Sequence, residues 1–159
     1  MHPATTDQTV LQVSEIMSRD VVTTSPDRTV EDFARELLER GYSGMPVVDA
    51  DGTLIGMVSE YDVISKRGRT VGDIMSRGVI SVAEETGADQ VAGVMGLHGI
   101  RRVPVVRDGR LVGMVSRTDL LRLFTSVRWT CPTCAHTETG FARPLRCPQC
   151  SGTAFNLSR

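Results

Sequence analysis

The sequence predicts an α+β protein that consists of two similar β-α-β-β-α halves followed by a small metal-bound β ribbon. Two observations carry this prediction: a duplicated series of motifs over residues 10–125, and four cysteines confined to the last 29 residues. With 159 residues, of which 40% are hydrophobic, the chain is long enough for one medium domain with a short appendix. It is also too apolar to be disordered throughout.

The duplication is visible as a near-constant offset between matching segments. Three segments of the first half recur 57 or 58 residues later: Ile16–Arg19 at Ile74–Arg77, Met45–Val48 at Val103–Val106, and Gly56–Ser59 at Gly113–Ser116. An ordered repetition of this kind indicates an internal duplication. We therefore expect two repeats, residues 10–68 and 69–125, packed with pseudo-twofold symmetry into one domain, because one small sheet cannot bury both of its faces alone.

Each repeat opens with a strand and a helix. Short β-branched runs at Val21–Thr24 and Val79–Val82 predict the strands. Apolar residues then recur at the spacing of one helix face, first at Val30, Phe33, Ala34, Leu37 and Leu38, and more weakly at Ala88, Val91, Ala92 and Met95. Glycine at 41 and at 99 stands where glycine commonly ends a helix.

A hairpin and a second helix complete each repeat. Asp51-Gly52 separates Pro46–Val48 from Leu54–Val58, and Asp108-Gly109 separates Pro104–Val106 from Leu111–Val115. An Asp-Gly pair between two apolar runs is a strong local signal for a β-hairpin. The closing helices are expected over residues 59–66 and 116–124.

The order of these motifs resembles the CBS domain, and the tandem resembles a CBS pair, or Bateman module. The resemblance rests on Ile-Met, an amphipathic helix, a hydrophobic-Pro-Val-Val strand, Asp-Gly and Gly-Met-Val-Ser-x-x-Asp, each found twice in this order. It covers about residues 10–125. It implies a regulatory module that binds an adenine-type nucleotide and forms a homodimer through its helices. Apolar residues expected on the outer helix surfaces, namely Val63, Ile64, Leu120 and Leu121, favour the same assembly.

The Ser-x-x-Asp sequences at Ser59–Asp62 and Ser116–Asp119 permit two interpretations. They form a capping-box pattern, in which the serine accepts an orphan helix N–H and the acid reaches back to the serine. In a cleft, the same carboxylate accepts hydrogen bonds from the two hydroxyls of a ribose, the contact that the family resemblance implies for Asp62 and Asp119. For Ser59 and Ser116 the two roles are compatible.

The two repeats differ in charge just before the proline of the hairpin. The second repeat carries Arg101 and Arg102, whereas the first has Ser43 and Gly44. The resemblance implies that basic residues at the arginine positions contact phosphate, and the planar guanidinium group suits this role. The alternative is a pair of solvated surface arginines. If both repeats bind nucleotide, their sites are therefore expected to be unequal.

The four cysteines follow the pattern C-x2-C-x12-C-x2-C, at Cys131, Cys134, Cys147 and Cys150. Two such turns place four thiolates around a tetrahedral ion, and a segment of this size needs the metal to fold. Residues 126–159 resemble a zinc ribbon or a rubredoxin-like knuckle, with Ala135 and Ser151 where glycine usually follows each knuckle. Zn²⁺ is preferred; an iron site and a dithiol pair remain alternatives. His136 is interpreted as a bystander.

Composition and charge limit the remaining functions. Eighteen basic and nineteen acidic residues leave a formal charge of −1, which favours neither nucleic acid nor a membrane. No apolar run reaches the ~20 residues that cross a bilayer, no signal-peptide core is present, and no catalytic motif is found. We expect a cytoplasmic, non-enzymatic sensor that signals to an unknown protein partner. A nucleic-acid-binding regulator that uses the ribbon, and an iron electron carrier, are the alternatives.

Overall fold

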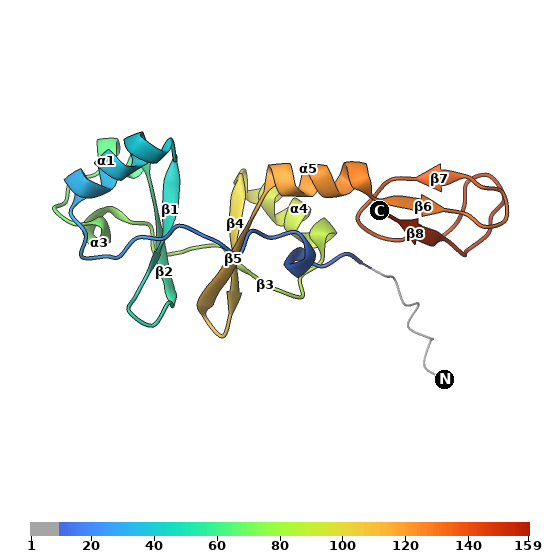
Figure 1. The fold of residues 1–159 in the computed structure, drawn as a ribbon, viewed down its shortest axis with the longest axis horizontal. Helices are drawn as coiled ribbons and strands as arrows, with labels where there is room; N and C mark the ends of the chain where they lie inside the picture. Colours follow the sequence, from blue (N-terminus) through green and yellow to red (C-terminus); the bar gives the residue numbers. More distant parts are fainter. Residues whose placement is uncertain (1–9) are drawn as a thin grey trace. The chain divides into compact units, whose positions relative to one another are not determined.

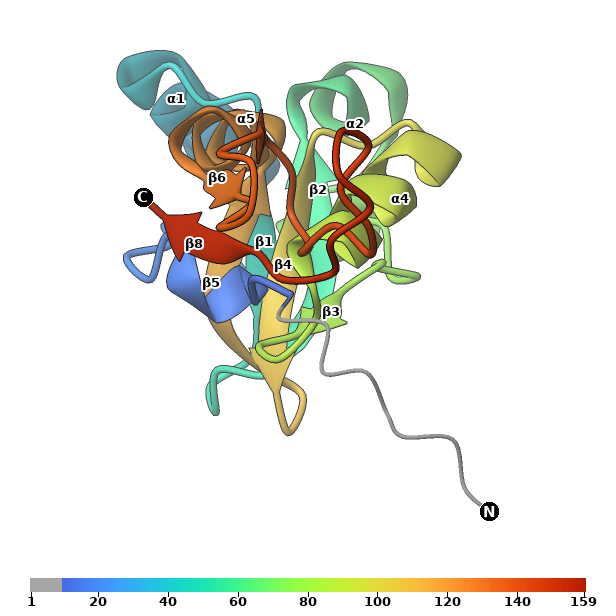
Figure 2. The same ribbon diagram turned by 90° about the vertical axis from the view of Figure 1, so that its right-hand side faces the viewer.

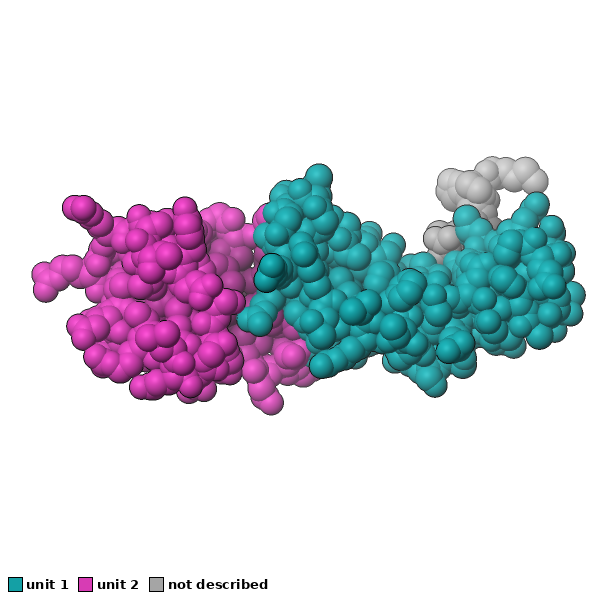
Figure 3. Space-filling view, turned by 90° about the horizontal axis from the view of Figure 1, so that it is seen from above, with its two compact units in different colours: residues 1–17, 84–103, 115–159 teal, residues 18–83, 104–114 magenta. Residues whose placement is uncertain are grey.

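The computed structural model describes residues 10–159 and has the predicted α+β architecture (Figure 1). The chain divides into two compact units (Figure 3). Unit 2 comprises residues 18–83 and 104–114. Unit 1 comprises residues 84–103, residues 115–159 and the N-terminal segment that ends at Met17. Unit 2 therefore contains most of the first repeat together with residues 69–83 and 104–114 of the second, and unit 1 contains the rest of the second repeat.

Unit 2 contains α1 (Val30–Arg40), β1 (Gly44–Val48), β2 (Leu54–Ser59), α2 (Glu60–Ser65), α3 (Val71–Ile74) and β3 (Val82–Ala83). Helix α1 begins at the Thr29 cap, whose hydroxyl accepts from the Asp32 N–H. It ends at Gly41, whose φ of 67° is costly for other residues. The core gathers apolar residues from several of these elements: Phe33, Leu37, Met45, Val47, Val58, Val71, Ile74 and Met75.

Both hairpins form around the Asp-Gly pairs. Strands β1 and β2 pair antiparallel with an irregularity between Val47 and Val48. Strands β4 (Arg102–Arg107) and β5 (Arg110–Ser116) are neighbours in a sheet of order β3-β4-β5, and Asp108 and Gly109 at their turn have φ of 51° and 78°. Two positive φ values are typical of the type I′ turn, whose twist matches that of the strands. In unit 2 the two turns also pair with each other, through Thr53 and Arg110.

The duplicated Met-Ser segments have a structural role that crosses the repeats. Ser76 of the second copy pairs with Met57 on the first hairpin, through N–H···O contacts of 2.9 and 2.8 Å. Ser18 of the first copy pairs in the same way with Met114 on the second hairpin. Each Met-Ser segment thus forms hydrogen bonds with backbone groups at the outer edge of the other repeat's hairpin.

Unit 1 contains the 3₁₀ turn η1 (Val13–Glu15), α4 (Ala88–His98), α5 (Arg117–Ser126) and the strands β6 (Arg128–Thr130), β7 (Thr137–Glu138) and β8 (Asn156–Ser158). Strand β6 lies between β7 and β8 in a small antiparallel sheet, and β6 and β8 are seen side by side in Figure 2. Helix α5 leads almost directly into β6. Buried Val127 and Trp129 join the ribbon to the rest of the unit.

The N-terminal segment is held on both sides within unit 1. The Val13 N–H donates to Thr86 O, and the Ala88 N–H donates to Leu11 O, at the start of α4. On the other side the Leu11 N–H donates to Phe141 O in the ribbon, and Arg159 forms an ion pair with Glu15 at 2.7 Å. Residues 11–15 therefore connect the ribbon to the second repeat.

Several expectations about single segments were wrong. Residues 79–81 form no strand, because β3 begins at Val82, and Val63 packs against the core of unit 2. Val21–Thr24 forms no strand; only Thr24 makes an isolated parallel bridge, to Val47. Leu38 is 85% exposed because it lies about 100° around the helix from buried Leu37. Leu120 is buried, whereas its neighbour Leu121 is exposed. Among the described residues 10–159, no helix is long and apolar enough to span a membrane.

Candidate functional site

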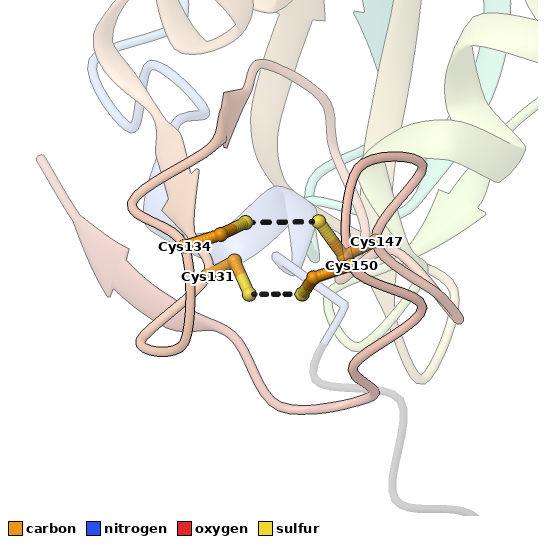
Figure 4. A group of neighbouring side chains, drawn as sticks. All are labelled: Cys131, Cys134, Cys147 and Cys150. Carbon is orange, nitrogen blue, oxygen red and sulfur yellow. Dashed lines mark hydrogen bonds between the residues drawn. The ribbon is translucent and has the colours of Figure 1, made fainter.

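The four cysteine side chains converge in the ribbon (Figure 4). Their four sulfur atoms lie within 4.8 Å of one another, and the shortest separations are 3.5 Å for Cys131–Cys150 and 3.6 Å for Cys134–Cys147. Cys131 directly follows β6, and Cys134 lies in the turn after it. Cys147 and Cys150 come from the loop before β8. Four sulfurs at these separations can surround one tetrahedral ion.

The backbone shapes each knuckle in the same way. The Ala135 N–H donates to Cys131 O, and the Ser151 N–H donates to Cys147 O, both at 2.9 Å. Ala135 and Ser151 have φ of 59° and 62°, so both adopt the left-handed conformation although neither is glycine. Gly152 allows a close approach, because a Cβ there would lie 3.3 Å from the Cys150 sulfur.

The thiols differ in acidity. Backbone N–H groups of Cys134 and Thr133 donate to the Cys131 sulfur and, against the effect of burial, lower the pKa of that thiol to about 6. At Cys134 the His136 N–H acts in the same direction, but burial and the neighbouring cysteines outweigh it and raise the pKa to about 12. A bound metal cation removes the repulsion between neighbouring thiolates, so the donor set fits a metal. His136 instead contacts Glu138, at 3.2 Å.

The left-handed backbone conformation of Ala135 predicts a measurable conformational strain. A non-glycine residue in this conformation costs roughly 1–2 kcal/mol, and the entropy of glycine offsets about half of that. Ala135→Gly should therefore stabilise the ribbon, by about 0.5–1 kcal/mol in a chelator competition or thermal melt. Ala142→Gly, at a bridge to Val10, is the matched control and should not stabilise. A less stable Ala135→Gly protein would contradict the strain.

In the first repeat, the Ser59–Asp62 pair is a complete capping box at the start of α2. Asp62 Oδ2 accepts from the Ser59 N–H and hydroxyl, both at 2.8 Å, and the Ser59 oxygen accepts from the Asp62 N–H. The other oxygen, Asp62 Oδ1, contacts Lys66 Nζ at 2.7 Å. Burial raises the pKa of the Asp62 carboxyl, but the hydrogen bonds from Lys66 and Ser59 outweigh it and lower the pKa overall.

In the second repeat, Ser116 and Asp119 form the same box at the start of α5, with Asp119 Oδ2 at 2.8 Å from the Ser116 N–H. Here the position of Lys66 is occupied by buried Leu123. Asp119 Oδ1 accordingly has no hydrogen-bond partner among residues 10–159. The two serine-aspartate boxes are thus alike in their caps and different in their remaining carboxylate oxygen.

Arg101 and Arg102 lie at the start of β4 beside this second box. The Arg117 N–H donates to Arg101 O, and Arg117 Nε donates to Ile100 O, both at 3.1 Å, so residues 100–102 are fixed against the first residue of α5. Both Arg101 and Arg102 are exposed, and neither side chain has a partner within the described part of the chain. Two unpaired guanidinium groups and the start of a ten-residue helix favour an anion.

Sequence reasoning did not identify two residues of these sites. Lys66 follows Asp62 at the i,i+4 spacing of a helical ion pair, a signal that the sequence did contain. Arg117 directly follows Ser116, where the first repeat has Glu60. The sequence also gave no sign of a cavity of about 520 Å³ in unit 2, which is lined by Thr23–Arg28 and Val48–Ala50.

Two successive stretches of the chain, residues 13–68 and 71–126, match the CBS domain. The chain belongs to the CBS domain family. The expected tandem CBS pair is therefore confirmed, and the four cysteines lie beyond the matched residues. Within this pair the Ser-x-x-Asp boxes occur once per CBS domain.

Known proteins share the CBS pair in different settings. The chain is 31% identical over 118 residues to an inosine-5'-monophosphate dehydrogenase of Methanocaldococcus jannaschii, which is 72% of this chain and 24% of that enzyme. It is 30% identical over 156 residues to CBSX1, a chloroplastic CBS domain-containing protein of Arabidopsis thaliana, covering 75% of this chain and 66% of that protein. The chain spans about a quarter of the length of the first enzymes it matches.

Two solved structures with bound ligands are similar to this chain. CBSX2 in complex with AMP has a TM-score of 0.66 at 29% identity, over 70% of this chain and 93% of that one. The CBS domain pair of protein MJ0100, in complex with 5'-methylthioadenosine and S-adenosyl-L-methionine, has a TM-score of 0.65 at 32% identity, over 73% and 97%. Both proteins bind adenosine derivatives.

Proposed function

We propose that this protein is a regulatory sensor that binds an adenine-type nucleotide in its CBS pair and reports the binding to a protein partner. The second repeat carries the proposal: within the described residues 10–159, Asp119 has a free carboxylate oxygen, and the nearby side chains of Arg101 and Arg102 are unpaired. In this arrangement Asp119 accepts from the ribose hydroxyls and the arginines bind the phosphate. The AMP complex of CBSX2 supports the same ligand class.

Charge distinguishes the ligands that similar CBS pairs bind. AMP carries a phosphate, whereas 5'-methylthioadenosine carries none and S-adenosyl-L-methionine is cationic at sulfur. Because the second repeat offers unpaired arginines, we assign it an anionic nucleotide such as AMP. The first repeat has Ser43, Gly44 and Glu60 at the corresponding positions and provides no comparable phosphate contact.

Arg102→Ala tests this assignment. Loss of a charged hydrogen bond should weaken AMP binding by about 1.5–3 kcal/mol, while adenosine, which makes no phosphate contact, should bind almost unchanged. Calorimetric titration of both ligands against wild type and variant measures the difference. Equal losses for AMP and adenosine would refute the phosphate role, and no binding of either ligand to wild type would refute the nucleotide sensor itself.

For the ribbon we propose a structural Zn²⁺ held by the four cysteines. Cys131 and Cys147 are buried, and all four positions of a tetrahedron are filled by protein, as in structural zinc sites. The ion would contribute the folding free energy that so small a sheet lacks. Metal analysis of protein isolated without added metal tests the proposal. A red protein with one iron per chain would favour the electron carrier instead.

We also propose that two copies associate through the CBS helices. Ile64 on α2 and Leu121 on α5 occupy equivalent positions in the two repeats and are 81% and 63% exposed. Leu38 on α1 and Leu97 on α4 extend the exposed apolar surface of each helix pair. A surface repeated by the duplication suits a symmetric homodimer.

The double variant Ile64→Asp, Leu121→Asp should be monomeric. Both side chains are exposed, so the charges should leave the fold intact while they oppose burial in an interface. Sedimentation at tens of micromolar should give a dimer for wild type and a 17.3 kDa monomer for the variant, with similar melting temperatures. A monomeric wild type at that concentration would contradict the dimer.

A further inference from the structure

The two aspartates of the CBS pair differ in how much hydrogen-bonding capacity they retain. Asp62 is 7% exposed, and both of its oxygens are engaged, Oδ2 by Ser59 and Oδ1 by Lys66. Among residues 10–159, Asp119 is engaged only through Oδ2, by Ser116. A ribose diol presents two hydroxyl donors, which need acceptor sites that are not already satisfied. Asp119 Oδ1 offers both of its lone pairs to the diol, whereas Asp62 Oδ1 keeps only one, beside the Lys66 ammonium group.

Lys66 is fixed from more than one direction. Besides Asp62 Oδ1, its Nζ atom donates to Ile74 O at 3.0 Å and lies 3.3 Å from the Ser76 hydroxyl. All three ammonium donors thus have acceptors. A ligand hydroxyl at Asp62 would have to displace a charge-assisted hydrogen bond that two further contacts hold in place.

We infer that Lys66 is a specificity residue that closes the first repeat to nucleosides, so that each chain binds one nucleotide, at the second repeat. The inference rests on the proposed nucleotide function and adds its stoichiometry. The two repeats differ at this position: Lys66 of the first repeat corresponds to Leu123 of the second, and no ammonium group of the described residues contacts Asp119. This single difference is sufficient to make the two aspartates unequal as acceptors.

Adenosine is the appropriate probe. The first repeat has Ser43 and Gly44 in place of the arginines, so even an open site there would lack phosphate contacts and would bind AMP poorly. Lys66→Met removes the ammonium group and keeps most of the length of the side chain. Ser76→Ala is the matched control, because it removes one contact of Lys66 and leaves the contact with Asp62.

Calorimetric titration with adenosine should give one site per chain for wild type and for Ser76→Ala, and two for Lys66→Met. The second site should disappear again in the double variant Lys66→Met, Asp62→Asn. This loss would assign the second site to the first repeat. Two sites in wild type, or one site in Lys66→Met that is folded by thermal melting, would overturn the inference and leave the sensor function standing. No adenosine or AMP binding to any of these proteins would instead refute the proposed function.

Discussion

Cys147→Ser should abolish stoichiometric zinc binding and unfold residues 128–159. In zinc-finger peptides the metal supplies about 10–16 kcal/mol, and one lost thiolate removes most of that affinity. The small β7-β6-β8 sheet has few buried apolar side chains of its own, chiefly Trp129 and Phe155. Without the ion, burial of these side chains should not compensate for the conformational entropy that the segment loses when it folds.

The effect should extend to one further amide and then stop. The Leu11 N–H donates to Phe141 O, so it should lose hydrogen-exchange protection together with the ribbon, whereas the Val13 N–H donates to Thr86 O in the second repeat and should stay protected. The core of unit 2 around Phe33 has no part in these contacts and should stay protected. Hydrogen exchange measured by mass spectrometry on the variant, the wild type and the chelated wild type shows which regions lose protection. When Zn²⁺ is added back, the chelated wild type should regain a protected ribbon, and the variant should not.

His136→Ala is the matched control for this experiment. His136 lies two residues after Cys134, but its ring contacts Glu138 and not the four sulfurs. The control should therefore keep one zinc per chain and a protected ribbon. Full protection of the ribbon in Cys147→Ser would contradict the metal's structural role. Simultaneous loss of protection in unit 2 would mean that the ribbon and both repeats unfold as one cooperative unit.

Asp119→Ala should weaken AMP binding by about 1.5–3 kcal/mol, the usual scale for a charged hydrogen bond, or roughly 10- to 150-fold in Kd. The reason is that the variant removes the free carboxylate oxygen assigned to the ribose. AMP and adenosine should lose affinity equally, because both carry the same diol. This pattern is the opposite of that expected for Arg102→Ala, so the two variants together separate ribose from phosphate contacts.

Asp62→Ala provides the comparison for Asp119→Ala. It removes the equivalent carboxylate from an equivalent capping box, so both variants should lose helix-capping stability in thermal melts. Only Asp119→Ala should lose nucleotide affinity as well, since Lys66 occupies Asp62. An unchanged Kd for folded Asp119→Ala would contradict the ribose contact, and equal losses in both variants would indicate that the two repeats bind alike.

Much of the fold could be predicted because the signals lie within short stretches of sequence. The helix spacing at Val30–Leu37, the left-handed Gly41 and the Asp108-Gly109 turn each depend on a few adjacent residues. The cysteine spacing likewise brings four sulfurs within 4.8 Å because each Cys-x-x-Cys turn is local. Local geometry of this kind depends little on the rest of the chain, so its sequence pattern was sufficient.

The tertiary structure alone decided the features that join distant segments. The exchange of Ser18 and Ser76 between the hairpins, and the placement of Leu11 beside Phe141, pair residues that are between 19 and 130 positions apart. The pairing of backbone groups over such distances depends on how all segments are buried together. A local sequence pattern therefore does not predict this pairing. For the same reason the sequence predicted a strand at Val21–Thr24, where the fold provides only one bridge.

The difference between the two aspartates combines both kinds of information. The sequence by itself determined that Asp62 and Asp119 occupy equivalent places in duplicated Ser-x-x-Asp sequences. Only the tertiary structure decided that Lys66 contacts Asp62 Oδ1 while Ile74 O and Ser76 hold the same ammonium group. The physical reason is that a lysine side chain is long and flexible, so its partner is set by the acceptors that the fold gathers around it.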